Sequence, residues 1–345
     1  MREKNTDLRK LEEPSSSLKD NLSLKKFFGT DGIRGIPNET LTEETVSKVC
    51  SSVEKILKPK TIALIADTRN SSEIISTWIS NGFSGDVTIF NYGILPSGSM
   101  PILLNELNHD IGIIISASHN PSEYNGIKLI DKNGSKLTDE VEVLIEATME
   151  TINLPEKTSA IKDSDTGYEN YKKFLNSVND IDFSQFNLVI DSANGAAYKI
   201  IRDIIPVNES TAIFIANEPN GTNINENSGA TDTKNLIEIM KEGQLGISFD
   251  GDADRLIMID ENKKVANGDV IIALLATYLS EIKQLDKESV VSTVMSNYGF
   301  KLAMKSNNFN LIETPVGDKY VAEAMKKHKD AGGGEQSGHI IVTKY

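Results

Sequence analysis

Residues 111–121 read Ile-Gly-Ile-Ile-Ile-Ser-Ala-Ser-His-Asn-Pro, and this stretch decides the fold. Its short β-branched run, bounded by turn residues, predicts a buried strand that ends in small polar residues and a proline. Ligands of open α/β sheets bind at the carboxyl ends of the strands, so this strand would deliver the Ser118 hydroxyl to a place suited to chemistry. For a Ser-His pair alone, the alternative is a strand followed by an ordinary capping serine.

A second stretch, Asp-Gly-Asp-Ala-Asp-Arg, places Asp250, Asp252 and Asp254 between two apolar runs. Three carboxylates separated by single small residues repel one another unless a hard cation lies among them, and ligands made only of oxygen favour Mg²⁺. An EF-hand is the main rival because Glu261 follows at the spacing of its last ligand, but Arg255 stands where that motif needs glycine. A solvated acidic turn is the other alternative. The flanking apolar runs indicate that this loop joins two buried strands.

Two glycine-rich stretches complete the set of motifs. Residues 332–339 read Gly-Gly-Gly-Glu-Gln-Ser-Gly-His. Their glycines let the backbone approach a ligand, and their polar side chains offer donors and acceptors suited to hydroxyl groups. Residues 28–35, Phe-Gly-Thr-Asp-Gly-Ile-Arg-Gly, place Arg34 where its planar guanidinium could grip a phosphate. Alone, the first is a common glycine-rich loop and the second is a tight turn with a surface arginine.

Together the four motifs, in the same order along the chain, resemble those of the α-D-phosphohexomutases. The resemblance covers the sequence from about Lys26 to its last residue. Residues 314–321, Thr-Pro-Val-Gly-Asp-Lys-Tyr-Val, and Gln336 are most similar to the branch that acts on amino-sugar phosphates. The branch that acts on mannose and glucose phosphates is the alternative. The resemblance therefore implies a cytoplasmic isomerase that moves phosphate between the 6- and 1-positions of a hexose or hexosamine phosphate.

The resemblance also implies a role for each motif. Ser118 carries a phosphoryl group, and its oxygen joins Asp250, Asp252 and Asp254 around Mg²⁺. The phosphoryl passes to the sugar phosphate, which becomes a bisphosphate, and Ser118 takes back the other phosphate. The remaining implied site residues are the proton-moving Lys128, the phosphate-steadying Arg34 and Arg255, the orienting His119, and the substrate contacts Glu335, Ser337, His339 and Lys319. Their plainer alternatives are solvated lysines, ordinary ion pairs and a loop histidine bonded to the backbone.

The amino-acid composition limits the classes of partner that this chain can bind. The 345 residues carry a net charge of −14, which disfavours nucleic acid and anionic membranes as partners. The single cysteine, Cys50, excludes an intramolecular disulfide and fits a reducing compartment. No apolar run approaches the roughly 20 residues of a membrane helix. The mixed charges, proline and serines of residues 1–23 predict a disordered tail.

Strand and helix patterns alternate along the rest of the chain and predict three related α/β domains with mostly parallel, mixed sheets. Their expected ranges are 24–160 with the serine loop, 161–262 with the metal loop and 263–345 with the sugar loop. The polar stretch 155–165 marks the first boundary. Thr40 and Glu43 predict a capping box at the start of the first helix.

The sequence differs from the family pattern at its end. Family members continue into a fourth domain whose loop grips the nonreacting phosphate, whereas this sequence ends at Tyr345, shortly after the sugar loop. We therefore expect the fourth domain to be absent and the third to be incomplete. A noncatalytic remnant that binds metal and sugar phosphate stays open as an alternative to an active enzyme.

Overall fold

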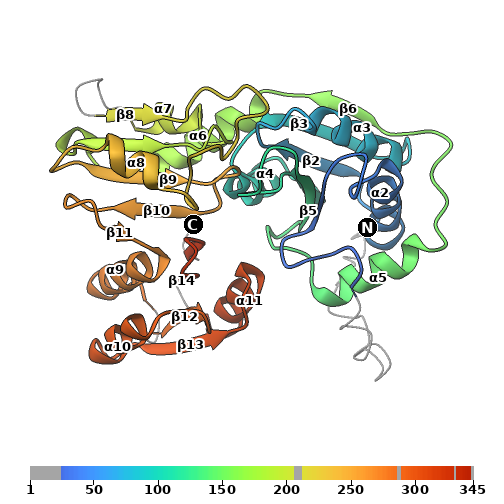
Figure 1. Cartoon of the computed structure of the whole chain (residues 1–345). Coiled ribbons are helices and arrows are strands. Elements are labelled where there is room, and N and C mark those ends of the chain that lie inside the picture. Colours follow the sequence, from blue (N-terminus) through green and yellow to red (C-terminus); the bar gives the residue numbers. More distant parts are fainter. Residues whose placement is uncertain (1–24, 206–211, 286–288, 330–331, 343–345) are drawn as a thin grey trace.

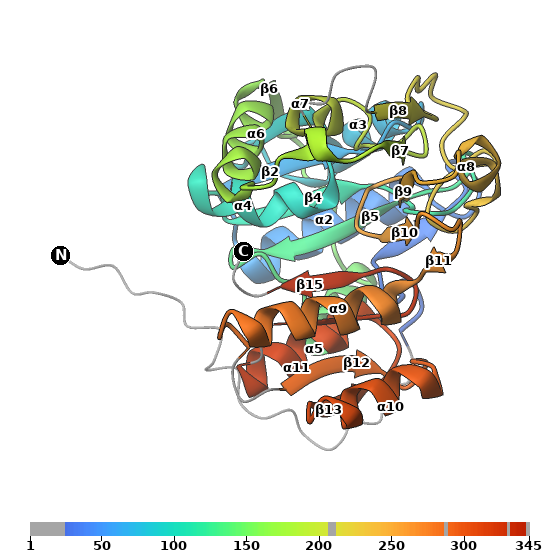
Figure 2. The ribbon, with the colours of Figure 1, turned by 90° about the vertical axis from the view of Figure 1, so that its left-hand side faces the viewer.

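Three α/β units, each with its own sheet, meet around a common centre (Figure 1). The computed structural model describes residues 25–205, 212–285, 289–329 and 332–342. The third unit lies below the second in Figure 1 and below both other units in Figure 2. The sequence prediction of three α/β domains with mixed sheets agrees with this architecture, while the predicted tail 1–23 falls outside the described residues.

The first unit is built on a six-stranded sheet of order β1-β5-β4-β2-β3-β6. Strand β5 is antiparallel to both of its neighbours, β1 and β4. The remaining pairs, β4 with β2, β2 with β3 and β3 with β6, are parallel. All five residues of β4 are buried, as expected of an isoleucine-rich central strand covered by helices on both faces. The elements are β1 (Ile33–Gly35), α2 (Glu43–Leu57), β2 (Thr61–Ala66), α3 (Ser72–Gly82), β3 (Thr88–Ile94), α4 (Met100–Glu106), β4 (Ile111–Ile115), β5 (Asn125–Asp131), α5 (Asp139–Met149) and β6 (Ala160–Asp163).

The start of α2 corrects the predicted capping box. The N-cap is Thr42, whose hydroxyl accepts from the backbone N–H of Thr45 at 3.2 Å. Thr40 instead accepts from the N–H of Ile36 at 2.8 Å and closes the turn before the helix. Two nearby threonines are both suitable N-cap residues, and the prediction of Thr40 was wrong.

The stretch 155–165 also differs from expectation, because it contains β6. This strand pairs in parallel with β3 and completes the first sheet. Its side chains are exposed or half-exposed, so it lacks the apolar alternation by which a strand is recognised in sequence. The chain leaves the first sheet only after this edge strand.

The second unit has the strand order β11-β10-β9-β7-β8. Strand β7 is parallel to β8 and β9, whereas β9 and β10 form an antiparallel pair joined by the acidic loop 250–255. Strands on both sides of the loop rule out an EF-hand, which requires flanking helices. The elements are α6 (Thr166–Val178), β7 (Leu188–Asp191), α7 (Ile200–Ile204), β8 (Ala212–Ile215), α8 (Lys234–Ile239), β9 (Leu245–Phe249), β10 (Leu256–Ile259) and β11 (Val265–Ala266).

The third unit has the strand order β13-β12-β14-β15. Strands β12 and β13 are parallel and therefore need a crossover, which α10 supplies. Asn297 caps this helix by accepting from the N–H of Phe300 at 2.9 Å. The elements are α9 (Gly268–Glu281), β12 (Ser289–Thr293), α10 (Tyr298–Ser306), β13 (Asn310–Thr314), α11 (Asp318–His328), β14 (Gly332–Gly334) and β15 (Ile340–Val342).

None of the helices in the described ranges combines the length and the apolarity that crossing a membrane requires.

Candidate active site

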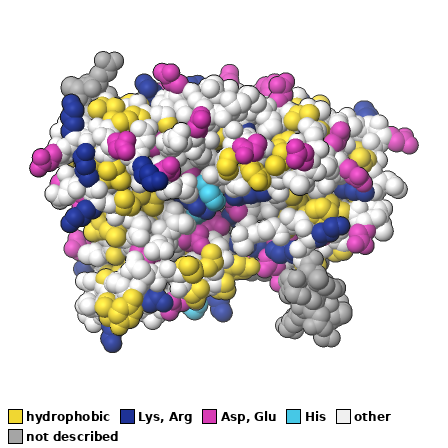
Figure 3. All heavy atoms as spheres, viewed as in Figure 1, with side chains coloured by type: hydrophobic (Ala, Val, Ile, Leu, Met, Phe, Trp, Pro, Cys, Tyr) yellow, Lys and Arg dark blue, Asp and Glu magenta, His cyan; other side chains and the backbone are white. Residues whose placement is uncertain are grey.

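The predicted serine and the acidic loop meet where the units converge. Charged side chains of both signs gather in the hollow at the centre of the face shown in Figure 3. Ser118 follows β4 and Asp250 follows β9, so each stands at the carboxyl end of a strand. The Ser118 hydroxyl donates to Asp250 Oδ2 at 2.6 Å, and both residues are fully buried. Tertiary structure thus joins two motifs that lie more than a hundred residues apart in sequence.

Ser118 has an unusual backbone conformation. Its φ of 50° lies in the left-handed region, which costs a non-glycine residue about 1–2 kcal/mol. The Ser116 hydroxyl accepts from the Ser118 N–H at 2.8 Å and donates to Asp67 Oδ2 at 2.6 Å. The loop is therefore held from the end of the neighbouring strand β2.

The acidic loop forms a compact set of oxygen ligands. One carboxylate oxygen from each of Asp250, Asp252 and Asp254 lies within 4.8 Å of the others. Among the described residues Asp252 Oδ1 is buried without a hydrogen-bond partner, which is costly unless a cation or water satisfies it. Three hard oxygen donors and an unsatisfied carboxylate oxygen fit a divalent cation such as Mg²⁺.

The pKa values of the clustered side chains also indicate that a cation would stabilise the cluster. Burial, with Asp254 and Asp252 nearby, raises the pKa of Asp250 well above its usual range. Burial opposes ionisation of Asp254 too, but Lys128 and His339 hold its pKa below the ordinary value. Burial likewise disfavours the ammonium of Lys128, yet the charges of Asp252, Asp254 and Asp31 raise its pKa well above normal. A cation added here would relieve the repulsion that Asp250 experiences.

Six residues from all three units form a closed series of charged contacts, which we call the charge ring: Asp31, Lys128, Asp254, His339, Asp318 and Lys136. Lys128 Nζ lies 2.9 Å from Asp31 and 2.8 Å from Asp254. His339 Nε2 lies 3.2 Å from Asp254 Oδ1, and its Nδ1 lies 3.7 Å from Asp318. Lys136 closes the ring by contacting Asp318 at 2.8 Å and also Asp31.

The other predicted phosphate contacts lie beside Ser118. Arg34 donates to Asn120 Oδ1 at 3.1 Å, and the Nε of Arg255 lies 3.9 Å from Asp250 Oδ2. His119 Nδ1 is 3.4 Å from the Ser118 hydroxyl oxygen. Burial, together with Arg255 and Arg34, lowers the pKa of His119 to about 4, so its ring is neutral at pH 7.

The residues predicted to contact the sugar lie in different surroundings. Glu335 accepts from the Gly317 N–H at 2.9 Å and is largely buried, whereas Ser337 is exposed. Lys319 lies apart from the cluster, with its ammonium 2.8 Å from Asp139 and 3.1 Å from Glu142 of α5. Lys319 therefore pairs with α5 and not with the acidic cluster.

Sequence reasoning missed several polar residues around the serine and the acids. Ser97 donates to Asp252 Oδ2 at 2.6 Å, and Asn225 donates to the Ser118 carbonyl at 2.9 Å. Asp67 and Arg69 follow β2, the parallel neighbour of β4. Polar residues at the carboxyl end of that strand were the available signal, since such ends meet at one edge of the sheet.

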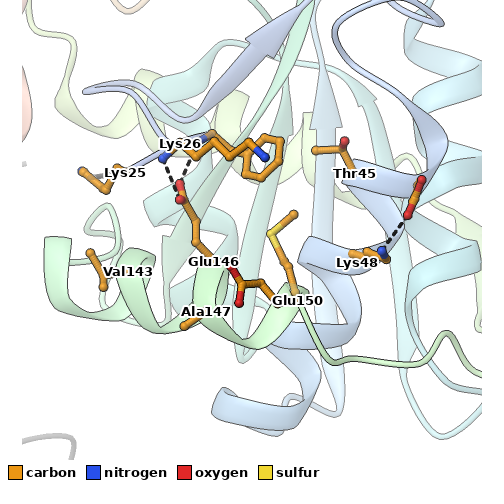
Figure 4. Close-up of a pocket in the computed structure, with 11 residues that line it drawn as sticks. Lys25, Lys26, Thr45, Lys48, Val143, Glu146, Ala147 and Glu150 are labelled. Carbon is orange, nitrogen blue, oxygen red and sulfur yellow. Dashed lines mark hydrogen bonds and ion pairs between the residues drawn. The ribbon is translucent and has the colours of Figure 1, made fainter. Parts of the chain in front are cut away.

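A cavity of about 530 Å³ lies elsewhere, between the start of the described chain, α2 and α5 (Figure 4). Glu146 faces it and accepts from the N–H groups of Lys26 and Phe27 at 2.7 and 2.8 Å. The cavity contains none of the predicted site residues. The catalytic candidates therefore lie in the junction between the units rather than in this cavity.

Comparison with protein families gives three matches in chain order. Residues 25–156, 168–264 and 267–345 match domains I, II and III described as phosphoglucomutase/phosphomannomutase, alpha/beta/alpha. These matches cover most of the chain and contain all four motifs.

Curated relatives give a more specific similarity. The chain is 39% identical over 336 residues to a phosphoglucosamine mutase of Alkaliphilus oremlandii, covering 93% of this chain and 74% of the relative. It is 40% identical over 337 residues to a phosphoglucosamine mutase of Clostridium kluyveri, covering 93% and 75%. The chain thus spans about three quarters of the length of these relatives.

Solved structures agree on the fold. A putative phosphomannomutase from Thermus thermophilus superposes with a TM-score of 0.81 at 22% identity, covering 92% of this chain and 75% of that one. A phosphoglucomutase/phosphomannomutase family protein from Burkholderia thailandensis gives a TM-score of 0.77 at 18% identity, covering 91% and 72%.

Proposed function

The chain belongs to the phosphoglucomutase/phosphomannomutase family, the α-D-phosphohexomutases, and we propose that it interconverts glucosamine 6-phosphate and glucosamine 1-phosphate. It is an isomerase of carbohydrate metabolism. The single observation that supports the chemistry best is the 2.6 Å hydrogen bond from the Ser118 hydroxyl to Asp250, beside two further carboxylates. The choice of sugar rests on the phosphoglucosamine mutases that the chain resembles at about 40% identity.

The metal would be held by Asp250, Asp252 and Asp254, with Ser118 as the fourth contributor. The unpartnered Oδ1 of Asp252 and the oxygen-only donor set support this proposal. When bound, Mg²⁺ neutralises the charge that develops on a transferring phosphoryl group.

In the first half of the reaction, the bond between phosphorus and Ser118 Oγ breaks and a bond forms to a hydroxyl oxygen of the sugar phosphate. The sugar hydroxyl loses its proton as it attacks, and one proton is returned to Ser118 Oγ as the bond to phosphorus breaks. His119 lies 3.4 Å from this leaving oxygen and has a neutral ring at pH 7, so it is suited to orienting the phosphoryl group on Ser118. Lys128, kept charged by three carboxylates, supplies positive charge next to the transfer.

In the second half, the bisphosphate presents its other phosphate and Ser118 Oγ attacks that phosphorus. The serine proton has an acceptor in Asp250, to which the hydroxyl already donates. Serine recovers a phosphoryl group and the sugar leaves with its remaining phosphate at the new position. Arg34 and Arg255 flank the serine and are suited to holding the phosphate oxygens during both halves.

The test separates phosphoryl transfer from sugar choice. The full chain is incubated with Mg²⁺ and glucosamine 1,6-bisphosphate, and intact mass reports whether one phosphoryl group is added. Glucosamine 6-phosphate is then supplied, and phosphorus NMR follows the appearance of the 1-phosphate, with mannose 6-phosphate as the competing substrate.

We expect wild-type protein to gain one phosphoryl group and to turn over the amino sugar faster than the mannose phosphate. Ser118→Ala should show neither, and Ser122→Ala, a serine in the same loop, should resemble wild type. Equal turnover by wild type and Ser118→Ala would refute the proposed nucleophile. Faster turnover of the mannose phosphate would refute the proposed sugar.

A further inference from the structure

The side chain of Arg69 binds the serine loop from outside it. Arg69 follows β2, and its guanidinium donates to four backbone carbonyls of the loop, those of Ser118, Asn120, Pro121 and Tyr124. The bonds to Ser118 and Asn120 measure 3.0 and 2.8 Å, both from Nη2, and the bond from Nη1 to Tyr124 measures 2.9 Å. One planar side chain thus fixes both ends of the turn that contains the serine.

The charge of Arg69 is balanced within the first unit. Its Nε lies 3.0 Å from Asp67 Oδ2, and both side chains are completely buried. The same Asp67 oxygen accepts from Ser116, whose hydroxyl in turn accepts from the Ser118 N–H. Asp67 and Arg69 therefore reach Ser118 by two routes, one to its N–H and one to its carbonyl.

The second unit grips the same carbonyls. Asn225 Nδ2 donates to the Ser118 carbonyl at 2.9 Å and to the Asn120 carbonyl at 3.0 Å. Two donors from different units thus converge on the residue whose φ of 50° is unfavourable for serine. A turn held only by its own short-range bonds would be free to relax from that conformation.

We propose that Arg69 is a positioning residue for the phosphoryl transfer, clamping the Ser118 turn with Asn225 so that the hydroxyl faces Asp250. This inference rests on the proposed function for its kinetic consequence, but the clamp itself is a structural statement. Arg69 donates to main-chain oxygens and does not touch the reacting atoms, so it acts through the geometry of Ser118. Displacement of a nucleophile by about 1 Å costs up to roughly a hundredfold in rate.

The main variant is Arg69→Lys, which keeps the positive charge beside Asp67 but loses the planar fork. Arg202→Lys, an exposed arginine of α7 stacked on Phe214, is the matched control. We expect Arg69→Lys to lower kcat at least about tenfold with little change in KM, because it misplaces the nucleophile without removing a substrate contact. Arg202→Lys should match wild type.

Hydrogen exchange tests the clamp without any substrate. In Arg69→Lys the amides of residues 117–120 and 122–124 should exchange faster, while those of β2 and β4 keep wild-type protection. Asn225→Ala should give the same pattern more weakly, and the two changes together should be non-additive because they act on the same carbonyls. In Arg69→Ala, millimolar guanidinium should restore part of kcat.

Each outcome decides the proposal. Wild-type kcat and wild-type exchange in Arg69→Lys would overturn it. Faster exchange spread equally over β2 and β4 would overturn it as well, since that would show a general loss of stability. If wild-type protein accepts no phosphoryl group, the proposed function fails, while the exchange pattern of residues 117–124 still decides whether the clamp exists.

Discussion

At the residue scale, Asp252 is the carboxylate with the clearest need for a cation. One of its oxygens accepts from Lys128 and Ser97 at 2.6 Å each, and the other is buried without a partner among the described residues. Asp252→Asn should weaken Mg²⁺ binding by at least about tenfold, because it replaces a hard anionic ligand with a neutral amide. Titration calorimetry with Mg²⁺ measures the effect.

Glu261→Gln is the matched control for Asp252→Asn. Glu261 is exposed in the turn after β10 and would be a principal ligand only in an EF-hand. We expect its replacement to leave Mg²⁺ affinity unchanged. A loss of affinity in Glu261→Gln, with none in Asp252→Asn, would show that the ligands have been misassigned.

Asp191 provides a pH-dependent test of the second unit. Burial raises the pKa of Asp191 to about 6, although it accepts from the N–H groups of Ala193 and Gly229. The folded chain therefore holds this proton more tightly than the unfolded chain, and the stability that it contributes falls as pH rises from about 4 to 6. The full shift corresponds to about 3 kcal/mol.

The measurement compares wild type with Asp191→Asn by chemical denaturation between pH 4 and pH 7. The stability of wild type relative to the variant should decrease across this range, because only wild type loses a proton there. A relative stability that increases with pH would mean that the hydrogen bonds outweigh the burial of Asp191.

Single residues also show the limits of sequence reasoning. Ser118 and the three aspartates could be placed from sequence because each follows a buried strand with a recognisable apolar pattern. Arg69 could have been placed at the same sheet edge, because it follows β2, but the carbonyls that it binds could not be predicted. Asn225 could not be placed, because it binds carbonyls of a segment far away in sequence. Lys319 was expected near the substrate, but its charge is neutralised on α5.

At the scale of elements, the turn between β9 and β10 must approach the serine loop closely. A Cβ atom on Gly251 would lie 2.5 Å from the Ser118 carbonyl oxygen and 2.9 Å from Asn225 Nδ2. Gly251→Ala should therefore separate Ser118 from Asp250 and lower kcat by roughly tenfold to a hundredfold. Steady-state kinetics of the mutase reaction measure the change.

Gly332→Ala at the start of β14 is the control for Gly251→Ala. Within the described part of the chain, a Cβ there meets only Leu279, at an ordinary 3.4 Å. This variant should keep wild-type kcat. If Gly251→Ala also keeps it, the two loops do not need the close approach seen in the structure.

Elements differ in how well the sequence predicts them. Four strands carry continuous apolar runs by which the sequence alone locates them: β2, β4, β9 and β10. The exposed edge strand β6 and the glycine strand β14 lack such runs. The crossover helix α10 is required by the parallel pairing of β12 with β13, and strand direction becomes known only when the sheet is assembled.

At the scale of the whole molecule, the units are joined by several kinds of contact. The first and second units share an apolar cluster, in which Ile200 packs with Met100 and Leu103. They also meet through bonds to backbone atoms, such as Thr68 to the Asn194 carbonyl at 2.5 Å and the Ser97 N–H to the Asp252 carbonyl at 2.8 Å. The third unit contacts the first through charged side chains, including Lys319 on Asp139 and Glu142. The third unit is also bonded to the second, because the Leu256 N–H donates to the Gly338 carbonyl at 2.9 Å. It is therefore the contact of the third unit with the first that depends on ion pairs.

Lys319→Met tests this dependence. Asp139 and Glu142 keep Lys25 as a partner, so α5 stays folded while the third unit loses an almost buried contact. We expect a larger radius of gyration in small-angle scattering and unchanged circular dichroism. Lys301→Met removes a surface pair with Glu313 inside the third unit and should leave the radius unchanged. An unaltered radius in both variants would show that other contacts hold the third unit in place.

The backbone contacts between the first two units bear on how the protein evolves. Amide and carbonyl groups exist at every position whatever side chain it carries, apart from the missing N–H of proline. Mutations accumulated over long divergence can therefore replace most of the surrounding residues while the serine still meets the acids in the same register. Such tolerance would explain how a chain sharing only 22% of its residues with this one retains nearly the same shape.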